Sequence, residues 1–458
     1  MQLFLSAPEK ENLRNWKYAV EDDSLTTKMF TPFWNWLVKL VPNTVSPNIL
    51  TLVGFLFILY SFHLSYKYGD EYNSWISIVV SLCTFIYMTL DAIDGKHARR
   101  IGNSSPLGEL FDHMCDNIGV VFMISTACML LGLENMTWQW YIIQSAQTVF
   151  LCSHIDAFKN KVVRFGKFNG PGEALMLYMF VLIVNGFGGF GHWAHEYISV
   201  CSENPLTFLD YLMPLVYLGV IIFTIIKIVH LGGGKAYSTR NGLLISLATK
   251  LVPFCMIQFG MISNELSMFT VIVHGLTMSV VTSDIIVAKM SNRNLHPLVP
   301  VIMMAGSLDD MICMILCVIY YLVILTEIAF HLRLPLFGVV RNVYCNGVFD
   351  MTHLGHMNLF KYAAQFGNKL IVGVHSDEAV EFYKRKPNMN QEIRYNTVRR
   401  CEYVDKVVEN ASLTITEEFI HEHNIHVVIC SPEYDNEEDK YYAAPRKMGI
   451  LQVKPRTE

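Results

Sequence analysis

Apolar segments long enough to cross a lipid bilayer recur along the first three quarters of the sequence, and few folds can accommodate them. A membrane-spanning helix needs about 20 predominantly apolar residues. Hydrophobic residues make up 52% of the 458-residue chain and charged residues only 16%, which is typical of a protein solvated largely by lipid. The pattern predicts a polytopic α-helical membrane protein with about ten transmembrane helices. They are expected at 48–67, 74–91, 108–133, 137–156, 173–189, 212–230, 241–263, 267–288, 297–308 and 311–330.

The distribution of charge divides the chain into regions. Charged residues are sparse before about residue 340 and then make up roughly a quarter of the sequence, which is the density of a soluble domain. We therefore expect a cytosolic N-terminal segment at 1–47, a membrane domain at 48–338 and a soluble domain at 339–458. The net charge is only −5 and no basic field indicates nucleic acid binding. The eleven cysteines include no CxxC pair, so buried thiols are favoured over disulfides or a zinc site.

Basic residues predict the topology. Lysines and arginines cluster in the loops that follow even-numbered predicted helices, whereas the loops after odd-numbered helices hold almost none, Lys67 being the exception. Basic residues next to membrane helices favour the cytosolic side. The alternation predicts an even number of spans with both termini in the cytosol.

A short apolar stretch precedes the first predicted span. Residues 30–40 place aromatic and aliphatic side chains at helical spacing with few charges. This pattern fits an interfacial helix on the cytosolic leaflet. It fits an ordinary helix packed on the bundle equally well, and the sequence leaves the two open.

Four aspartates flank a short polar connection. Asp91 and Asp94 lie three residues apart, and Asp112 and Asp116 lie four apart, so each pair shares one face of a predicted helix. A helical hairpin would bring the two pairs together. An ionised aspartate at membrane depth costs about 2.5 to 3.5 kcal/mol, so a cation is expected to neutralise the group. Hard oxygen ligands suit Mg2+ or Mn2+, and two ions are expected.

Small and basic residues accompany the aspartates. Gly95, Ala98 and Gly108 would let the helices and a phosphate approach closely. Lys96 and Arg99 are placed to hold phosphate oxygens. The alternative is that the carboxylates are helix ends solvated in the headgroup region.

These residues resemble a known enzyme signature. The eight residues Asp91, Asp94, Gly95, Ala98, Arg99, Gly108, Asp112 and Asp116 fill every fixed position of the pattern D-x2-D-G-x2-A-R-x8-G-x3-D-x3-D. This is the signature of the CDP-alcohol phosphotransferases. The wider stretch from about 10 to 338 is similar to the choline/ethanolamine phosphotransferase branch, including Ser46-Pro47-Asn48, Ser153-His154 and Gly170-Pro171-Gly172-Glu173-Ala174.

The resemblance implies a reaction. The hydroxyl of diacylglycerol would attack the β-phosphate of CDP-choline or CDP-ethanolamine and release CMP. It implies that Asp91, Asp94, Asp112 and Asp116 bind metal, and that Asp116 also accepts the hydroxyl proton. His154 is the rival base, or it only hydrogen-bonds within the bundle. The same likeness places Asn48 and Glu173 in substrate binding, with Glu173 orienting His154 or marking the acceptor site, and it places the protein in the endoplasmic reticulum or Golgi.

The soluble region has an α/β pattern. Apolar strands are expected from Val343, at 369–375 and at 426–430, and helical segments separate them. Alternating strands and helices predict a parallel sheet that binds ligands at the carboxyl ends of its strands. His353 and His356 open a predicted helix, where backbone N–H groups and the helix dipole favour phosphate.

Residues 341–458 resemble the cytidylyltransferases that act on phosphocholine or phosphoethanolamine. The motifs are G-x-F-D-x-x-H-x-G-H at 347–356, I-V-G-V-x-S-D-E at 371–378, Lys384, Arg394-Tyr395 and Tyr403-Val404-Asp405. The likeness implies a Rossmann-like α/β nucleotidyltransferase fold. In such a domain His353 and His356 bind the phosphates of CTP and stabilise the transition state, Lys384 and Arg456 bind substrate, and Mg2+ accompanies CTP.

The soluble region departs from that family at three places. Ile393 replaces a usual glutamate, and Cys430-Ser431-Pro432 replaces the usual residues after the late strand. The family element R-T-E-G-I-S-T-S begins at Arg456, and the chain stops at Glu458. We therefore expect a domain truncated at its C-terminus, so that either the sequence is a fragment or the domain is catalytically impaired.

Three functional hypotheses remain open from the sequence. The first is a bifunctional enzyme that makes a CDP-alcohol from CTP and the phospho-alcohol and then transfers the headgroup. The second is a phosphotransferase whose C-terminal domain is a non-catalytic nucleotide-binding or regulatory module. The third is a transporter or scaffold whose acidic helices line a cation path. The partners expected are the nucleotides, diacylglycerol and the membrane, with a homodimer left open.

Overall fold

The computed structural model describes two units of the chain. The described residues are 4–16, 19–133, 135–167, 170–188, 208–231, 236–258, 266–305, 309–436 and 438–455. The first unit consists of Met1–Arg99 and Ser104–Leu332, and the second of Arg100–Asn103 and Arg333–Glu458. The expected domain boundary at 338 and 339 falls in the connection between the last helix of the first unit and the first strand of the second.

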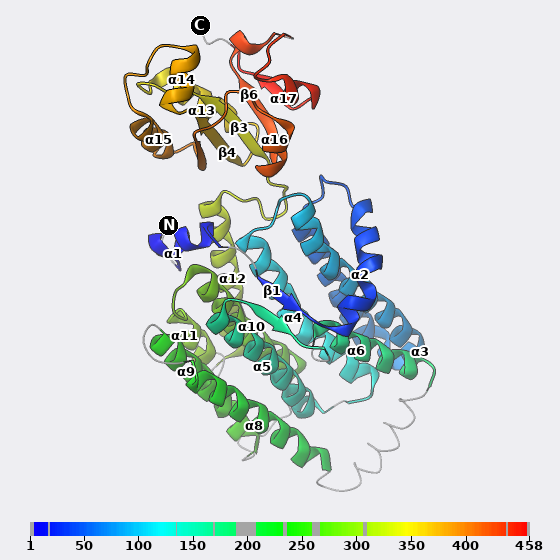
Figure 1. The fold of residues 1–458 in the computed structure, drawn as a ribbon. Coiled ribbons are helices and arrows are strands. Elements are labelled where there is room, and N and C mark those ends of the chain that lie inside the picture. Colours follow the sequence, from blue (N-terminus) through cyan, green and yellow to red (C-terminus); the bar gives the residue numbers. More distant parts are fainter. Residues whose placement is uncertain are drawn as a thin grey trace. The chain divides into compact units, whose positions relative to one another are not determined.

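The first unit is helical (Figure 1). Its elements are α1 (Ala7–Arg14), β1 (Val20–Asp22), α2 (Leu25–Leu37), η1 (Val38–Leu40), α3 (Pro47–Arg100), α4 (Pro106–Leu130), α5 (Met136–Asn160), β2 (Val163–Phe165), α6 (Pro171–Gly186), α8 (Phe208–Val229), α9 (Ala236–Gln258), α10 (Met268–Ser291), α11 (Leu298–Ala305) and α12 (Asp310–Leu332).

Membrane-spanning helices are confirmed as the main feature of this unit. Within the described residues, 6 segments are long and apolar enough to cross a bilayer. They are Pro47–Gly69, Asn73–Arg100, Pro106–Leu130, Leu212–Val229, Met268–Ser291 and Asp310–Leu332. The count of ten spans stays a prediction, because α6 and α11 have only 16 and 8 residues, and α5 and α9 are not among these six.

Helix α3 contains two spans that lie side by side. A straight helix of its 54 residues would be roughly 80 Å long. Instead, the Thr51 hydroxyl near its start donates to the carboxylate of Asp94 near its end. A Cβ atom on Gly54 would lie 3.3 Å from the Tyr87 ring. The chain therefore reverses direction between Gly69 and Asn73, and the two spans are antiparallel.

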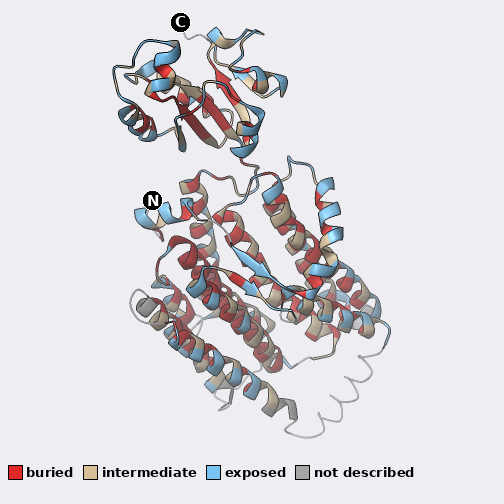
Figure 2. Ribbon diagram, viewed as in Figure 1, coloured by how far each residue is buried: buried red, intermediate tan, exposed pale blue. Residues whose placement is uncertain are grey.

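Helix α10 is the centre of the bundle. Of its most apolar window, 89% is buried, far more than in the other candidate spans. It packs against α4, α5 and α12, and its buried surface is visible in Figure 2. A helix that is buried on all sides in this way belongs to the core of the bundle.

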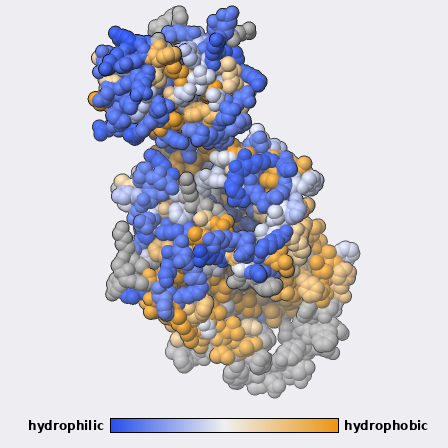
Figure 3. Space-filling view, viewed as in Figure 1, coloured by the Kyte–Doolittle hydropathy of each residue, from blue (hydrophilic) through white to orange (hydrophobic). Residues whose placement is uncertain are grey.

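The N-terminal segment is attached to the bundle. Strand β1 pairs in parallel with β2, with Val20 opposite Val163. One face of α2 packs through Trp34 against a cluster that includes Met88 and Ile93. The other face exposes an apolar stripe at helical spacing, made of Leu25, Met29, Phe33 and Trp36, and Leu40 at the end of η1 is exposed as well. In Figure 3 the surface of the first unit is hydrophilic around α1 and β1 and becomes hydrophobic toward the bottom of the view. The interfacial location of α2 stays a prediction.

The second unit is a parallel α/β domain, as predicted. Its sheet has the order β5-β4-β3-β6-β7, and every pair in it is parallel. The strands are β3 (Asn342–Gly347), β4 (Lys369–Val374), β5 (Lys406–Glu409), β6 (Ile425–Cys430) and β7 (Leu451–Val453). The helices are α13 (Leu354–Ala363), α14 (Asp377–Tyr383), α15 (Gln391–Arg399), α16 (Glu417–Glu422) and α17 (Ala443–Lys447), with the 3-10 helix η2 (Pro432–Tyr434).

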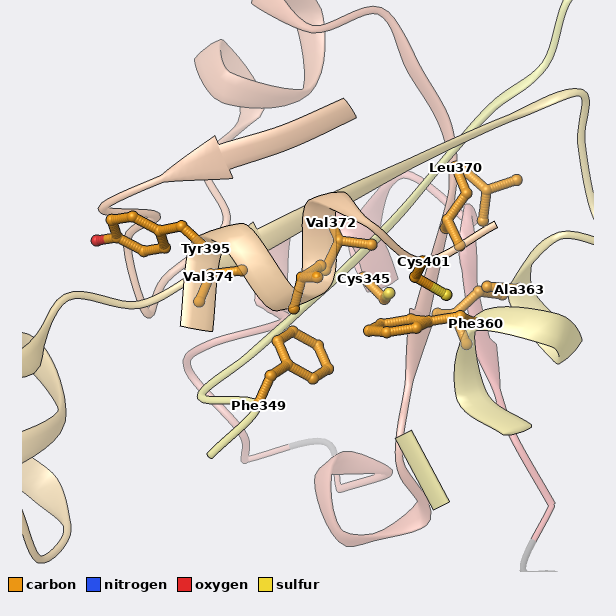
Figure 4. Packing of buried hydrophobic residues seen from close by; sticks show 12 residues of the cluster. Cys345, Phe349, Phe360, Ala363, Leu370, Val372, Val374, Tyr395 and Cys401 are labelled. Atoms are coloured by element: carbon orange, nitrogen blue, oxygen red, sulfur yellow. The ribbon is translucent and has the colours of Figure 1, made fainter. Parts of the chain in front are cut away.

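The core of the second unit explains the strand sequences. Five of the six residues of β4 are buried, as is usual for a parallel strand covered on both faces. One core cluster includes Val372, Phe349 and Phe360, which Figure 4 shows packed together. A second cluster includes Tyr344 of β3 and Ile371 of β4. The three predicted strands are confirmed, whereas β5 and β7 are short and had no clear pattern in the sequence.

The cysteines that the structure describes form no disulfide bonds. The ten cysteines within the described ranges are free, and nine of them are buried. This confirms the expectation of buried thiols for the part of the chain that the structure describes.

Candidate functional site

The four predicted aspartates converge as two overlapping groups. Asp91 and Asp94 lie about two turns before the end of α3, and Asp112 and Asp116 lie in the first half of α4. One ligand atom from each of Asp91, Asp94 and Asp112 lies within 4.8 Å of the others. The same holds for Asp112, His113 and Asp116. The hairpin therefore brings the pairs together as predicted, and Asp112 belongs to both groups.

Hydroxyl groups hold two of the carboxylates. The Tyr87 hydroxyl donates to Asp116 Oδ1 over 2.6 Å, and Thr51 donates to Asp94. Asp112 Oδ1 is buried and has no hydrogen-bond partner among the described residues. A buried carboxylate oxygen without a donor is costly, so this atom is suited to a cation.

The start of α4 lies against the start of α3. Ser105 caps the helix and accepts a hydrogen bond from the Gly108 backbone N–H over 3.1 Å. A Cβ atom on Gly108 would lie 3.4 Å from Asn48 Oδ1. Asn48, at the beginning of α3, therefore lies against the first turn of α4.

The residues that follow Asp94 occupy different environments. The Arg99 guanidinium folds back over Gly95, 3.5 Å from where a Cβ atom would be. Ala98 is half-buried and the Arg99 residue as a whole is exposed. Lys96 donates to Asn35 Oδ1 over 3.1 Å, so the structure places this lysine against α2.

Glu173 also lies beside α2. Its Oε1 accepts a hydrogen bond from the Thr26 backbone N–H over 2.9 Å. It thereby binds one of the unpaired amides in the first turn of that helix. Its Oε2 is buried without a hydrogen-bond partner among the residues that the structure describes.

His154 lies beside His113, which in turn lies near Asp116. Its ring centroid lies 5.1 Å from that of His113, and His113 Nδ1 lies 3.9 Å from Asp116 Oδ2. His154 is 4% exposed. His113 and Tyr87 were missed in the sequence, although His113 directly follows Asp112 and Tyr87 precedes Asp91 by one helical turn.

The second unit has a pocket at the carboxyl ends of its strands. It has a volume of about 410 Å³ and is lined by His353, His356 and Lys384, together with residues that end or follow β3, β4 and β6. The structure thus brings three of the predicted binding residues into one pocket. Arg456 lies outside the described residues.

Two histidines open α13, as predicted. His353 Nδ1 accepts a hydrogen bond from the Gly355 backbone N–H over 3.0 Å, and His356 Nδ1 accepts one from the His353 backbone N–H over 3.4 Å. A neutral ring that accepts at Nδ1 carries its proton at Nε2. Burial lowers the pKa of His356 below its ordinary value, and His353 lowers it further. The neutral His356 ring is therefore favoured, with Nε2–H as its donor.

Arg394 fixes the loops around this pocket and is fully buried. It donates to Val348 O over 2.7 Å, to Met389 O over 3.1 Å and to Asp377 Oδ1 over 2.7 Å. These acceptors follow β3, precede α15 and begin α14, respectively. One side chain thus ties together three segments that surround the pocket.

Two family models match the chain in different regions. The model described as CDP-alcohol phosphatidyltransferase matches residues 44–202, which contain all four aspartates. The model described as cytidylyltransferase-like matches residues 344–444, which contain the pocket histidines.

Curated relatives match the membrane region. Cholinephosphotransferase 1 of Rattus norvegicus is 33% identical over 247 residues, 52% of this chain and 61% of that protein. Choline/ethanolaminephosphotransferase 2 of Arabidopsis thaliana is 32% identical, covering 55% and 67%. Cholinephosphotransferase 1 of Gallus gallus is 33% identical, covering 53% and 72%.

The overlap with these relatives is partial. The chain spans 61% of the length of the rat protein and 59% of the length of the human one. A lipopolysaccharide core biosynthesis protein from Thermoplasma volcanium covers 26% of this chain and 99% of its own, at 21% identity and a TM-score of 0.23, which is too low to establish a shared fold. The signature aspartates, the family model that contains them and relatives of this identity lead to one conclusion: the chain belongs to the CDP-alcohol phosphatidyltransferase family.

Proposed function

We propose that the chain transfers phosphocholine or phosphoethanolamine from a CDP-alcohol to diacylglycerol and releases CMP. The observation that carries this proposal is the pair of carboxylate groups that share Asp112 between α3 and α4. The names of the relatives, cholinephosphotransferase and choline/ethanolaminephosphotransferase, support the same chemistry. Membrane-spanning helices suit an acceptor that is itself a lipid.

The donor set fits Mg2+ or Mn2+. Asp91, Asp94 and Asp112 would hold one ion, and Asp112 with Asp116 a second, since each group offers hard oxygen ligands within a short distance. The unpartnered oxygen of Asp112 supports this assignment. When bound, such ions neutralise charge on the two phosphates and assist departure of the nucleotide.

The protein's own residues bind the substrate and accept the proton. Arg99 and Lys96 follow Asp94 on α3 and would bind phosphate oxygens. The lipid hydroxyl forms a bond to the β-phosphorus, the bond from that phosphorus to the CMP oxygen breaks, and the hydroxyl proton passes to a base. Tyr87 holds Asp116 by its Oδ1 atom, and Oδ2 is the oxygen nearer His113. We assign the base role to Asp116, with His154 as the alternative reached through His113.

Product analysis tests this function. The purified full chain in lipid nanodiscs would receive diacylglycerol and either CDP-choline or CDP-ethanolamine, and CMP and phospholipid would be measured. We expect CMP and phospholipid in equal amounts with Mg2+ or Mn2+, and neither product after the metal is chelated. Activity that persists after complete chelation would contradict the metal assignment. No product with either donor, in the presence of metal, would contradict the function.

A second activity is favoured by the pocket of the second unit. We infer that this unit binds CTP and transfers its cytidylyl group to a phospho-alcohol. The bond between the α-phosphorus and the bridging oxygen breaks, pyrophosphate leaves and the phospho-alcohol oxygen takes its place. The Nε2–H groups of His353 and His356 would donate to phosphate at the amino end of α13. Lys384 in the same pocket would contact a substrate phosphate, and Mg2+ would accompany CTP.

Release of pyrophosphate tests the second activity. The full chain would be incubated with CTP and phosphocholine or phosphoethanolamine. We expect pyrophosphate from the native chain. In His356→Ala the rate of its release should fall about 100-fold or more, because a hydrogen-bond donor to the phosphates is removed. His421→Ala, on α16 outside the pocket, is the matched control. Binding of CTP without pyrophosphate would identify the unit as a non-catalytic nucleotide-binding module.

The cellular setting belongs to the same proposal. The predicted cytosolic loops carry the basic residues, which supports cytosolic termini. That orientation gives the second unit access to CTP. The likeness to the choline/ethanolamine branch supports the endoplasmic reticulum or Golgi, and a homodimer stays an open prediction.

A further inference from the structure

The N-terminal residues before β1 are anchored to the first unit. Leu13 on α1 is fully buried. Asn12 donates to the Ser291 carbonyl, the last residue of α10, over 2.8 Å. Lys10 pairs with Glu327 of α12 over 2.9 Å, with side chains 12% and 6% exposed. These contacts fix α1 against α10 and α12, and Trp16 follows two residues after the end of α1.

Trp16 and Lys289 hold the same carboxylate. The Trp16 indole Nε1–H donates to Glu109 Oε2 over 2.6 Å, and the Lys289 ammonium lies 2.6 Å from Glu109 Oε1. The side chains of Lys289 and Glu109 are 2% and 5% exposed. The same ammonium lies 5.3 Å from the centroid of the Trp16 ring, within the range of a cation–π interaction. Both oxygens of Glu109 are therefore fixed by elements far away in the sequence.

Glu109 lies on the face of α4 that carries the site. Helical residues advance by about 100° each, so Glu109, Asp112 and Asp116 fall within an arc of roughly 60°. Like charges on Asp91, Asp94, Asp112 and Asp116 repel one another and favour a rotation of α4 away from α3. An anchored Glu109 opposes that rotation one turn before the first aspartate of the helix.

We propose that Trp16 and Lys289 are positioning residues for the carboxylate site. By fixing Glu109 they set the rotation of α4, and hence where Asp112 and Asp116 lie relative to the aspartates of α3. This inference rests on the proposed metal site. It adds a supporting role for the N-terminal segment, which lies outside the signature motif. Trp16 and Lys289 bind Glu109, which is not one of the four aspartates, so the expected effect is on cation affinity.

Binding of Mn2+ tests the proposal. Free Mn2+ would be measured by electron paramagnetic resonance during titration of the purified full chain, without substrate. Trp16→Phe keeps the aromatic ring and removes the N–H donor. We expect its Mn2+ dissociation constant to rise about tenfold, the scale found when a hydrogen bond that orients metal ligands is lost. Trp75→Phe is the matched control, because Trp75 is 73% exposed, and we expect its constant to equal that of the native chain.

Kinetics separate positioning from general damage. For Trp16→Phe we expect CMP release to require about tenfold more Mn2+ for half-maximal rate, with the rate at saturating Mn2+ within about twofold of native. If Trp16→Phe does not fold, Glu109→Gln, which keeps the side-chain shape, should show the same weakening. Native Mn2+ affinity in the folded variant overturns the inference alone. Failure of the native chain to bind Mn2+ overturns the proposed metal site as well.

Discussion

Replacement of Asp112 by asparagine should lower the release of CMP from a CDP-alcohol by about a thousandfold or more, because it removes a ligand that both cation groups share. Asp112 is the only residue common to the two groups found among the described residues. Asparagine has the same shape, so packing around α4 should be preserved. Steady-state CMP release at saturating donor, alongside thermal unfolding of the detergent-solubilised protein, measures the two effects separately.

Asp156→Asn is the matched control for Asp112→Asn. Asp156 lies on α5, its side chain is 52% exposed and it pairs with Lys227. An exposed pair of this kind contributes at most about 1 kcal/mol, so activity should stay within about twofold of native. If Asp112→Asn also keeps native activity, the carboxylate groups are not catalytic. A native chain that releases no CMP with either donor would instead favour the hypothesis of a transporter or scaffold with an acidic cation path.

Replacement of Arg394 by alanine should destabilise the second unit by about 3 to 5 kcal/mol, because it empties a fully buried site and removes the donors to two backbone carbonyls and to Asp377, whose side chain is 31% exposed. Arg394 is fully buried, and its donors bind Val348 O, Met389 O and Asp377. Domains are stable by only about 5 to 15 kcal/mol, so the loss would expose much of this unit to local unfolding. Hydrogen exchange of peptides from β3 and β4 should accelerate while peptides from α10 stay protected.

Arg399→Ala provides the comparison on the same helix. Arg399 is also on α15, but its side chain is 52% exposed and pairs with Glu409 at the surface. Its loss should cost about 0 to 1 kcal/mol. Equal exchange rates in Arg394→Ala and Arg399→Ala would show that the buried contacts of Arg394 do not hold the pocket loops.

Local patterns in the sequence were sufficient for much of this description. The spacing of Asp91 and Asp94, and of Asp112 and Asp116, predicted two shared helix faces in a hairpin, and the structure confirms the approach of the pairs. The position of His353 and His356 at the start of a helix was predicted correctly for the same reason, since capping depends on a few neighbouring residues. Apolar runs identified three of the five parallel strands.

Contacts between distant residues had no such signal. The hydrogen bond from Trp16 to Glu109 joins residues 93 positions apart in the sequence, and the ion pair of Lys289 with Glu109 joins residues 180 positions apart. Asn48 meets Gly108 only because α3 reverses and α4 returns beside its start. In the same way, β5 and β7 are too short for a clear apolar pattern and are defined by pairing with β4 and β6.

The residue types and their helical or strand spacing thus determined the membrane-spanning character of the first region, the α/β character of the second and the identity of the acidic residues. Periodicity and capping act over a few residues, so they can be read along the chain. Tertiary structure alone decided that Asp112 serves both carboxylate groups, that His113 lies between Asp116 and His154, and that the N-terminal segment reaches Glu109. Those facts depend on how helices pack in three dimensions, where the partners of a side chain are set by distance in space rather than by position in the sequence.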